Sequence, residues 1–156
     1  MSEPLELASL PDPENPGWFV WNLKDSTRFN GHVFGKLSVR RDEDGRGRLR
    51  MFPQRQHTNL ADNVHGGALL ALADVALFAI PYLQGKAGSG SAVTLDLGMQ
   101  FLAPGRPGEP CEAVGEVLRE TGRLVFVRAL IEQQGQAIAA FSGTLRKLGR
   151  PPSRGD

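Results

Sequence analysis

The chain has 156 residues, a length that suits one domain. Its 18 basic and 17 acidic side chains leave a formal net charge of +1. This balance argues against a nucleic-acid-binding protein, which normally gathers a basic excess on one face, and a hydrophobic share of 40% argues against a wholly disordered chain.

The two ends of the chain carry little that could anchor them. Residues 1–16 contain four prolines and no apolar period, so a flexible arm is expected there, and residues 149–156 are expected to form a disordered tail. The N-terminus also lacks the basic and apolar pattern of a signal peptide. A single domain over residues 17–148 follows from these limits.

Two strands are expected first, over residues 33–41 and 46–52. They flank the segment Asp42–Gly45, whose Asp-Gly pair suits a hairpin turn that needs positive φ. In the second strand, arginines alternate with Gly47, Leu49 and Met51. A period of two predicts one wet face and one dry face.

A helix is expected over residues 64–80. Asp62 or Asn63 could cap its start, because a short side-chain oxygen accepts from the free N–H groups there, and Pro81 or Gly85 could end it. Apart from His65 and Asp74, every side chain in this range is apolar or absent. A helix that is apolar on all sides is expected to be buried on all sides.

The apolar run within this helix also bears on whether the protein enters a membrane. The window from residue 68 to residue 80 is interrupted by Asp74 and is too short to span a bilayer. The single cysteine, Cys111, cannot form an intramolecular disulfide, so a reduced compartment is expected. Together these features predict a cytoplasmic protein that does not enter a membrane.

Four more strands are expected, over residues 92–102, 112–120, 124–132 and 136–147. In the first, five apolar side chains alternate with four polar or small ones, which predicts one continuous apolar face. Short glycine-containing links separate the other three and indicate an antiparallel meander. The expected fold is α+β, a six-stranded antiparallel sheet wrapped around one central helix in the order β-β-α-β-β-β-β.

The start of the helix carries a pair of glycines, Gly66 and Gly67. The first helical turn leaves N–H groups without intrahelical acceptors, and the helix dipole adds positive potential there. Without side chains, a ligand oxygen could approach these donors closely, as a carbonyl does when it becomes an oxyanion. The alternative is an ordinary tight turn between a loop and a helix.

Asp74 is the one carboxylate within the apolar helix. An unpaired carboxylate in an apolar interior costs several kcal/mol, so a buried one is normally paired, shifted in pKa or functional. The expectation is a catalytic base or nucleophile, and the alternative is a structural carboxylate bonded to an arginine or to backbone N–H groups.

The glycine pair and Asp74 lie far apart along the predicted helix. Gly66 and Asp74 are eight positions apart, which places them roughly 12 Å apart along one helix. Two groups that serve one carbonyl must both lie within about 3 Å of the reacting atoms. If they act together, Asp74 must come from a neighbouring subunit whose helix runs antiparallel, which predicts a homodimer with two composite sites.

Several motifs combine into a resemblance. Asn59, the triplet His65-Gly66-Gly67, Asp74, and the strand Val93–Asp96 followed by Phe101–Pro104 resemble the hotdog-fold PaaI-type acyl-CoA thioesterases. The resemblance covers roughly residues 30–147, including the strand order and the central helix. It implies a hotdog fold and the hydrolysis of an acyl-CoA thioester to a free acid and coenzyme A.

The resemblance also implies roles for five residues. The Gly66 N–H would bind the thioester carbonyl, and Asp74 would attack the carbonyl carbon or activate a water. Asn59 would orient the substrate or the water, Thr94 would help to hold the water, and His65 would lie beside the thioester. Structural alternatives remain for three of them: a loop cap for Asn59, an ordinary strand threonine for Thr94, and a loop anchor for His65.

Coenzyme A phosphates need basic side chains, and Arg clamps phosphates well. The turn Arg119–Arg123 resembles one that lies near the nucleotide in relatives, and Arg106 is a second candidate; either could instead be a solvated surface charge. The substrate-binding candidates are therefore Gly67, Arg106, Arg119, Thr121, Gly122 and Arg123. Coenzyme A belongs to the substrate, so no cofactor is expected. His32, His57, His65 and Cys111 lack zinc-ligand spacing, so no metal is expected either.

Two other functions stay open. One is a non-catalytic acyl-CoA sensor, against which Asp74 argues, because a binder gains nothing from an anion beside a thioester. The other is hydration of an acyl thioester; the hydratases of this fold have an Asp-x-Asn-Pro-x-His loop, whereas here Asp62 directly precedes Asn63 without a proline. Exposed edge strands also leave open a dimer or a tetramer built from two dimers.

Overall fold

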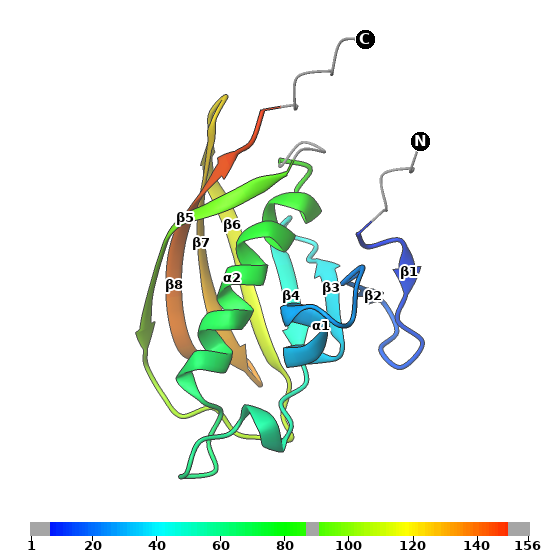
Figure 1. Ribbon diagram of the computed structural model, residues 1–156, viewed down its shortest axis with the longest axis vertical. Coiled ribbons are helices and arrows are strands. Elements are labelled where there is room, and N and C mark those ends of the chain that lie inside the picture. The colour runs from blue at the N-terminus through cyan, green and yellow to red at the C-terminus, as the bar shows by residue number, and fades with distance from the viewer. Residues whose placement is uncertain (1–6, 87–90, 150–156) are drawn as a thin grey trace.

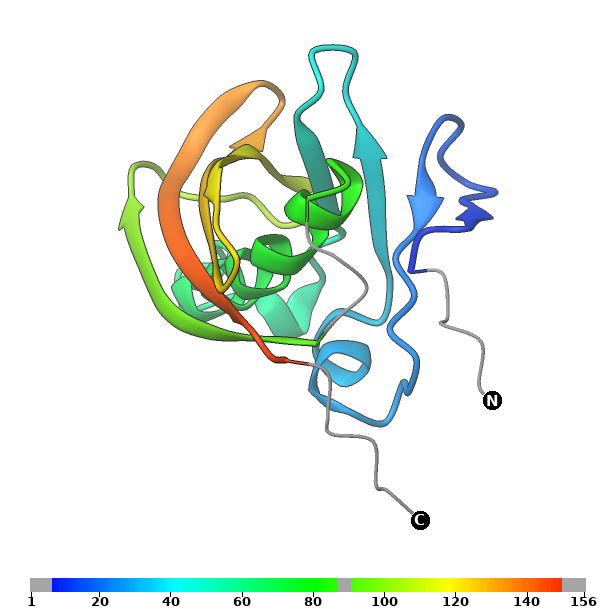
Figure 2. The same cartoon turned by 90° about the horizontal axis from the view of Figure 1, so that it is seen from above.

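The structure is a computed structural model that describes residues 7–86 and 91–149. A strongly curved antiparallel sheet wraps around one long helix, α2, as Figures 1 and 2 show. Over these residues the sheet has eight strands in the order β1-β2-β3-β4-β6-β7-β8-β5. The strands are β1 (Leu10–Pro11), β2 (Phe19–Val20), β3 (Leu37–Arg41), β4 (Gly47–Met51), β5 (Ala92–Phe101), β6 (Cys111–Glu120), β7 (Leu124–Gln133) and β8 (Gln136–Lys147); the helices are α1 (Phe29–Phe34), the 3-10 turn η1 (Arg55–His57) and α2 (Gly66–Leu83).

The predicted sheet around a central helix is confirmed, but the predicted count of six strands is wrong. The two extra strands, β1 and β2, are only two residues long and extend the sheet beyond β3. Strands this short carry no readable alternation, so the sequence has no signal for them.

Part of the predicted flexible arm is held against the sheet. Asp12 is buried and accepts hydrogen bonds from the Ser38 hydroxyl at 2.5 Å and from Lys36 Nζ at 2.8 Å. The described residues do not include residues 1–6 of the predicted arm or residues 150–156 of the predicted tail. The arm expectation therefore does not hold from Leu7 to Asp12: Leu7 and Ala8 pack against the core, and charged hydrogen bonds hold Asp12.

The strand expected to begin at Val33 begins at Leu37 instead. Val33 and Phe34 belong to the short helix α1, which rests on His57. The Nε2 atom of His57 lies 2.5 Å from the Val33 carbonyl oxygen, and its ring stacks on Phe34 with 6.5 Å between centroids. Contacts with a distant residue thus override the local strand pattern.

The turns between the strands follow the expected glycine chemistry. Gly45 closes the β3–β4 hairpin with φ +87°, and Gln134 and Gly135 close the β7–β8 hairpin with φ of 49° and 76°. Two consecutive positive φ values are those of a tight hairpin turn whose twist matches the strands. The antiparallel meander from β6 to β8 is thereby confirmed.

The helix α2 differs from its prediction at both ends. His65 caps its start, not Asp62 or Asn63; Asp62 instead lies in the preceding turn with φ +58°. At the other end the helix continues through Pro81 to Leu83, and Gln84 caps it. Pro81 is tolerated because only one intrahelical hydrogen bond is lost in the last turn of the helix.

One side of α2 faces away from the sheet. Its buried side chains, among them Leu69, Leu72 and Leu77, pack against the concave face. Gly67, Leu70 and Asp74 lie three and four residues apart and are exposed. The expectation that α2 is buried on all sides is wrong for a single chain, and we call this exposed set the open stripe.

Among the described residues, α2 is long and apolar enough to span a membrane, judged by length and composition alone. More than half of the apolar window, 56%, is buried against the rest of the chain. A core helix passes the same test, and the sheet that wraps α2 identifies it as one.

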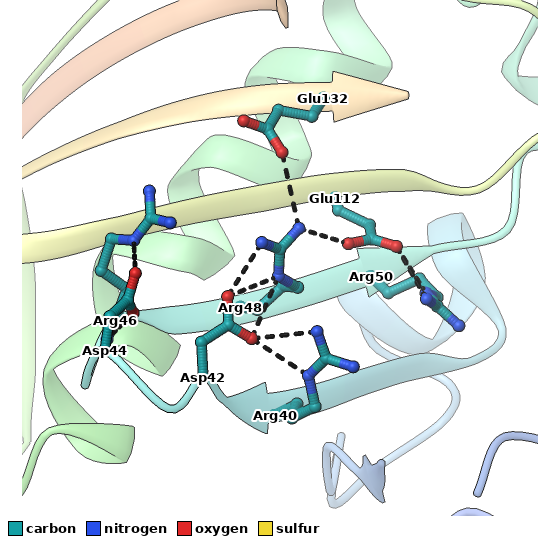
Figure 3. Close-up of polar contacts among 8 residues, drawn as sticks. All are labelled: Arg40, Asp42, Asp44, Arg46, Arg48, Arg50, Glu112 and Glu132. Atoms are coloured by element: carbon teal, nitrogen blue, oxygen red, sulfur yellow. Dashed lines mark hydrogen bonds and ion pairs between the residues drawn. The ribbon is translucent and has the colours of Figure 1, made fainter. Parts of the chain in front are cut away.

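The outer face of the sheet carries an ion-pair network (Figure 3). Arg48 on β4 contacts Asp42 at 2.8 Å, Glu112 at 2.6 Å and Glu132 at 3.5 Å. Arg40 and Arg50 extend the network on either side through Asp42 and Glu112. These charges compensate one another across four strands of the sheet.

Candidate active site

The first turn of α2 leaves one N–H group free. The Gly67 N–H donates to Nδ1 of His65 at 2.8 Å, and the Ala68 and Leu69 N–H groups donate to the His65 carbonyl. Within residues 7–86 and 91–149, no backbone or side-chain atom accepts a hydrogen bond from Gly66. The Gly66 N–H is therefore a free donor at the positive end of the helix dipole, whereas the Gly67 N–H is already used.

The residues before α2 hold this turn in place. The Val64 N–H donates to the Gly105 carbonyl at 2.8 Å, and the His65 N–H donates to the His57 carbonyl at 2.7 Å. Asn59 closes the loop that precedes them, because its Oδ1 accepts from the N–H groups of Ala61 and Asn63, at 3.0 and 3.2 Å. The structural roles weighed for His65 and Asn59, a loop anchor and a loop cap, are thus both present.

A cavity of about 430 Å³ opens beside Gly66. Asn59 and Asn63 lie on its polar side, and Phe101 borders the glycine itself. A Cβ atom on Gly66 would lie 3.2 Å from the Phe101 ring. The rest of the lining is formed by Val64, Leu69, Leu102, Ala103, Pro104 and Gly105.

Asp74 lies on the open stripe and is exposed, so the expectation of a buried carboxylate is wrong for one chain. The Thr94 hydroxyl donates to its Oδ1 at 2.8 Å. Asp74 forms no ion pair with a basic side chain in the described part of the chain. The arginine partner weighed as a structural alternative is absent there, and the second oxygen of Asp74 remains available.

An irregularity in β5 brings Thr94 to Asp74. The pairing of β5 with β8 shifts register between Thr94 and Asp96, so the single apolar face expected along this strand is interrupted. Thr94 turns toward α2, while Val93 and Leu95 are 40% and 55% exposed. A local register shift has no signature in an alternating pattern, which is why the sequence suggests one continuous face.

The candidate residues form two groups in one chain. Asn59 and Gly66 line the cavity at the start of α2, while Asp74 and Thr94 contact each other further along the helix. Asp74 is not among the residues that line the cavity beside Gly66. The eight-residue separation, roughly 12 Å along the helix, is therefore not closed within one subunit.

The arginine candidates lie at opposite ends of the fold. Arg119 and Arg123 are exposed at the β6–β7 turn, where the Arg123 carbonyl accepts from the N–H of Lys147, whose strand partner is Ala92. Arg106 is also exposed and follows Gly105, the residue that anchors the entry to α2. Arg106 thus belongs to the Gly66 end of the helix and the β6–β7 turn to the other end (Figure 1).

The β6–β7 turn is internally hydrogen-bonded. The Thr121 Oγ1 accepts from the N–H groups of Leu124 and Arg123, at 2.9 and 3.3 Å, and the Thr121 N–H donates to the Leu124 carbonyl at 2.8 Å. Gly122 at its tip is exposed. Thr121 therefore shapes the turn, and the two arginine side chains extend from a fixed backbone.

Gln133 holds the loop behind the cavity and was not anticipated. Its Oε1 accepts from the Arg106 N–H at 2.8 Å, and its Nε2 donates to the carbonyls of Arg106 and Glu109, at 2.9 and 3.0 Å. A lone glutamine at the end of a strand has no sequence signal for this role. Its neighbour Cys111 is buried, which raises the pKa of that thiol to about 12 and removes it as a nucleophile near neutral pH.

The described residues contain no group of three or more His, Cys, Asp or Glu side chains that could hold a metal ion. His57 is engaged through both ring nitrogens, with the Gln54 N–H and with the Val33 carbonyl.

Comparisons with known proteins give a consistent answer. Residues 61–140 match the family model described as thioesterase superfamily. The acyl-coenzyme A thioesterase PaaI of Escherichia coli (strain K12) is 34% identical over 97 residues, which cover 60% of this chain and 65% of that enzyme. The chain thus aligns with slightly less than two thirds of this curated relative.

Solved structures agree in fold. A mutant form of the phenylacetic acid degradation protein PaaI from Thermus thermophilus superposes with a TM-score of 0.61 at 28% identity, covering 72% of this chain and 93% of that one. The E. coli PaaI protein from the phenylacetic acid degradation operon superposes with a TM-score of 0.67 at 24% identity, covering 81% and 86%.

Proposed function

Because the chain belongs to the thioesterase superfamily and has the hotdog fold of its PaaI-type members, we propose that it hydrolyses acyl-CoA thioesters to a free acid and coenzyme A. The observation that carries this proposal is that two polar groups on α2 lack full hydrogen-bond or ion-pair partners among the described residues. They are the Gly66 N–H, which has no acceptor among the described residues, and the Asp74 carboxylate, which has one hydroxyl donor and no cation there.

Each group has a role in thioester cleavage. The Gly66 N–H binds the carbonyl oxygen and stabilises the negative charge that develops there, with the helix dipole behind it. Asp74, as a general base, removes a proton from the water that attacks the carbonyl carbon; the carbon–sulfur bond then breaks and the departing thiolate takes up a proton. As a nucleophile, Asp74 instead forms a mixed anhydride that water hydrolyses.

Isotopic labelling can identify the nucleophile route for Asp74. A single turnover in H₂¹⁸O places the label only in the product acid if Asp74 is a base, and also if water attacks the acyl carbonyl of an anhydride. Attack of water on the aspartyl carbonyl of an anhydride places the label in the Asp74 carboxylate, which mass spectrometry of the peptide detects.

The two groups form one site in a homodimer. The open stripe of α2 and the edge strand β5, with exposed Val93 and Leu95, are the surfaces that a second copy would cover. If the two α2 helices run antiparallel, the partner's Asp74 lies at this chain's Gly66, and two equivalent sites result. Burial by the partner would also supply the apolar surroundings expected for Asp74.

The same arrangement places the basic side chains. Arg106 lies at the Gly66 end of its own chain, and the partner's β6–β7 turn approaches that end in an antiparallel pair. Arg106, Arg119 and Arg123 would then meet the phosphates of coenzyme A. Water is the only other reactant, so the proposed reaction consumes no redox or group-transfer cofactor.

Thiol release from a panel of acyl-CoAs tests the function. We expect release by the unaltered protein and a loss of about 10²- to 10⁴-fold in kcat for Asp74→Asn, the range expected when a base is removed. Asp44→Asn is the matched control, because Asp44 is an exposed aspartate in the β3–β4 turn, away from the open stripe and from β5. Acyl-CoA binding without thiol release would identify a sensor, and enoyl-CoA hydration without thiol release would identify a hydratase; either result contradicts the proposal.

A further inference from the structure

The cavity beside Gly66 is lined by apolar side chains and two amides. Val64 and Leu69 are almost fully buried at its base, and Phe101, Leu102, Ala103 and Pro104 form the other side. None of its lining residues is charged. A pocket of this composition accommodates apolar groups and disfavours a carboxylate, which would lose its hydration without gaining a cation.

Phe101 holds a particular position in this cavity. It ends β5 and pairs with the buried Ala139, on the face of the sheet that looks toward α2. Its ring is the group that a Cβ atom on Gly66 would meet at 3.2 Å, so it packs against the residue whose N–H is free. The ring therefore borders the place where a carbonyl bound to that N–H continues into its acyl group.

Phe101 is little buried within its own chain. It is 54% exposed, in contrast to Leu69, which is 2% exposed in the same cavity. A change of size at Phe101 therefore alters the cavity without opening a hole in the core.

From these contacts we propose that the cavity takes an uncharged apolar acyl group and that the Phe101 ring sets the length of acyl chain accepted. This inference rests on the proposed thioesterase function and adds the substrate class of that site. Because the ring borders Gly66, the acyl chain leaves the carbonyl along the ring, and the ring narrows the space into which a longer chain continues.

The experiment compares kcat/KM for butyryl-CoA, octanoyl-CoA, decanoyl-CoA and succinyl-CoA. Phe101→Ala is expected to raise the decanoyl-to-butyryl ratio at least about tenfold, and Phe101→Trp to lower it, because a few methylenes in an apolar pocket discriminate by this much. The matched control is Phe19→Ala, the same substitution in β2, near the opposite edge of the sheet, which should leave the ratio unchanged.

Charge is tested in the unaltered protein. Succinyl-CoA and butyryl-CoA have acyl chains of equal length and differ by one carboxylate, so kcat/KM for succinyl-CoA is expected to be at least about tenfold lower. Comparable rates on the two would overturn the proposed class of acyl group.

The outcomes separate the inference from the function beneath it. Thiol release with a chain-length profile that is the same in the Phe101 variants and in the unaltered protein overturns the role of Phe101 and leaves the thioesterase intact. A uniform fall on all acyl-CoAs in Phe101→Ala, with an unchanged melting temperature, also overturns it, because a ring that narrows the cavity acts on length. No thiol release from any acyl-CoA by the unaltered protein overturns both.

Discussion

The outer face of the sheet and the open stripe of α2 differ in how their carboxylates are partnered. On the outer face over β3, β4 and β6, Asp42 lies between two guanidinium groups, and Glu112 lies between two as well (Figure 3). On the open stripe, Asp74 receives one hydrogen bond, from Thr94. The first region compensates its charges internally, whereas the second leaves a carboxylate available.

The N-terminal segment belongs to the compensated side. Trp18 is buried against the cationic side chains Arg40 and Arg50, whose Cζ atoms lie 4.6 and 3.8 Å from its ring. Cation–π contacts of this kind stabilise a fold and leave no group free for a substrate. The comparison indicates that charges paired with one another stabilise the fold. Polar groups without such partners are the candidates for a functional site.

Removal of the free donor at Gly66 should have the largest effect. Gly66→Pro keeps the first helical position, where proline is tolerated, but it deletes the N–H. Relative to Gly66→Ala, which adds a comparable Cβ beside Phe101 and keeps the N–H, kcat for thioester cleavage should fall about 10²- to 10³-fold. Equal rates for the two variants in a thiol-release assay would remove Gly66 from the reaction.

Loss of a central charge on the other side should affect stability instead. Arg48→Met leaves Asp42, Glu112 and Glu132 without their shared partner. The free energy of unfolding should fall by about 3 kcal/mol in urea titrations, while kcat of the folded protein stays within about twofold. A large loss of kcat at unchanged stability would show that the network serves the reaction.

The anchor of the N-terminal segment should contribute less. Burial opposes the charge of Asp12, but hydrogen bonds from Lys36 and Ser38 outweigh it and hold the pKa of the Asp12 carboxyl well below its usual 3.8. Asp12→Asn should therefore lower the free energy of unfolding at pH 7 by about 2 kcal/mol, the scale of charge-assisted hydrogen bonds.

The effect of pH on Asp12 has a defined sign. Because the pKa is lower in the folded state, the stabilisation is fully present above the unfolded value of about 3.8 and is lost as the pH falls toward the folded value. The stability gap between the unaltered protein and Asp12→Asn should therefore shrink from pH 7 to pH 3. A gap that widens in acid would contradict the assignment.

The hydroxyl beside Asp74 should have the smallest effect. Thr94→Val keeps the shape and removes the 2.8 Å hydrogen bond, so kcat should fall roughly tenfold, as for the loss of one hydrogen bond to a charged group. Thr144→Val, on β8, is the matched control and should leave kcat unchanged.

The architecture could be predicted from the sequence because its signals are local. Alternation along β4, the glycine turns at Gly45 and Gly135, and the apolar run of α2 each specify an element without reference to the rest of the chain. The strands β1 and β2 and the helix α1 could not be predicted, because distant contacts hold them and no periodic pattern marks them. Asp12 bonds to Ser38 beside β1 and β2, and His57 contacts Val33 in α1.

The site was predicted in part. The sequence placed Gly66 at the helix start and singled out Asp74, but the burial of Asp74 was inferred from composition alone. Which side of α2 faces the sheet depends on how the sheet curves, and the exposure of Gly67, Leu70 and Asp74 follows from that. The register shift that turns Thr94 toward Asp74 is likewise a property of strand pairing.

The central claim is that the partner's Asp74 and this chain's Gly66 serve one thioester. Its most direct test is thiol release by a mixture of two inactive variants, Asp74→Ala and Gly66→Pro, unfolded together and refolded at equal amounts. Random pairing makes half of the dimers mixed, and one of the two sites in each is intact, so about a quarter of the unaltered activity should return. If both groups of a site came from one chain, every site would keep a defect, and mixing would restore nothing.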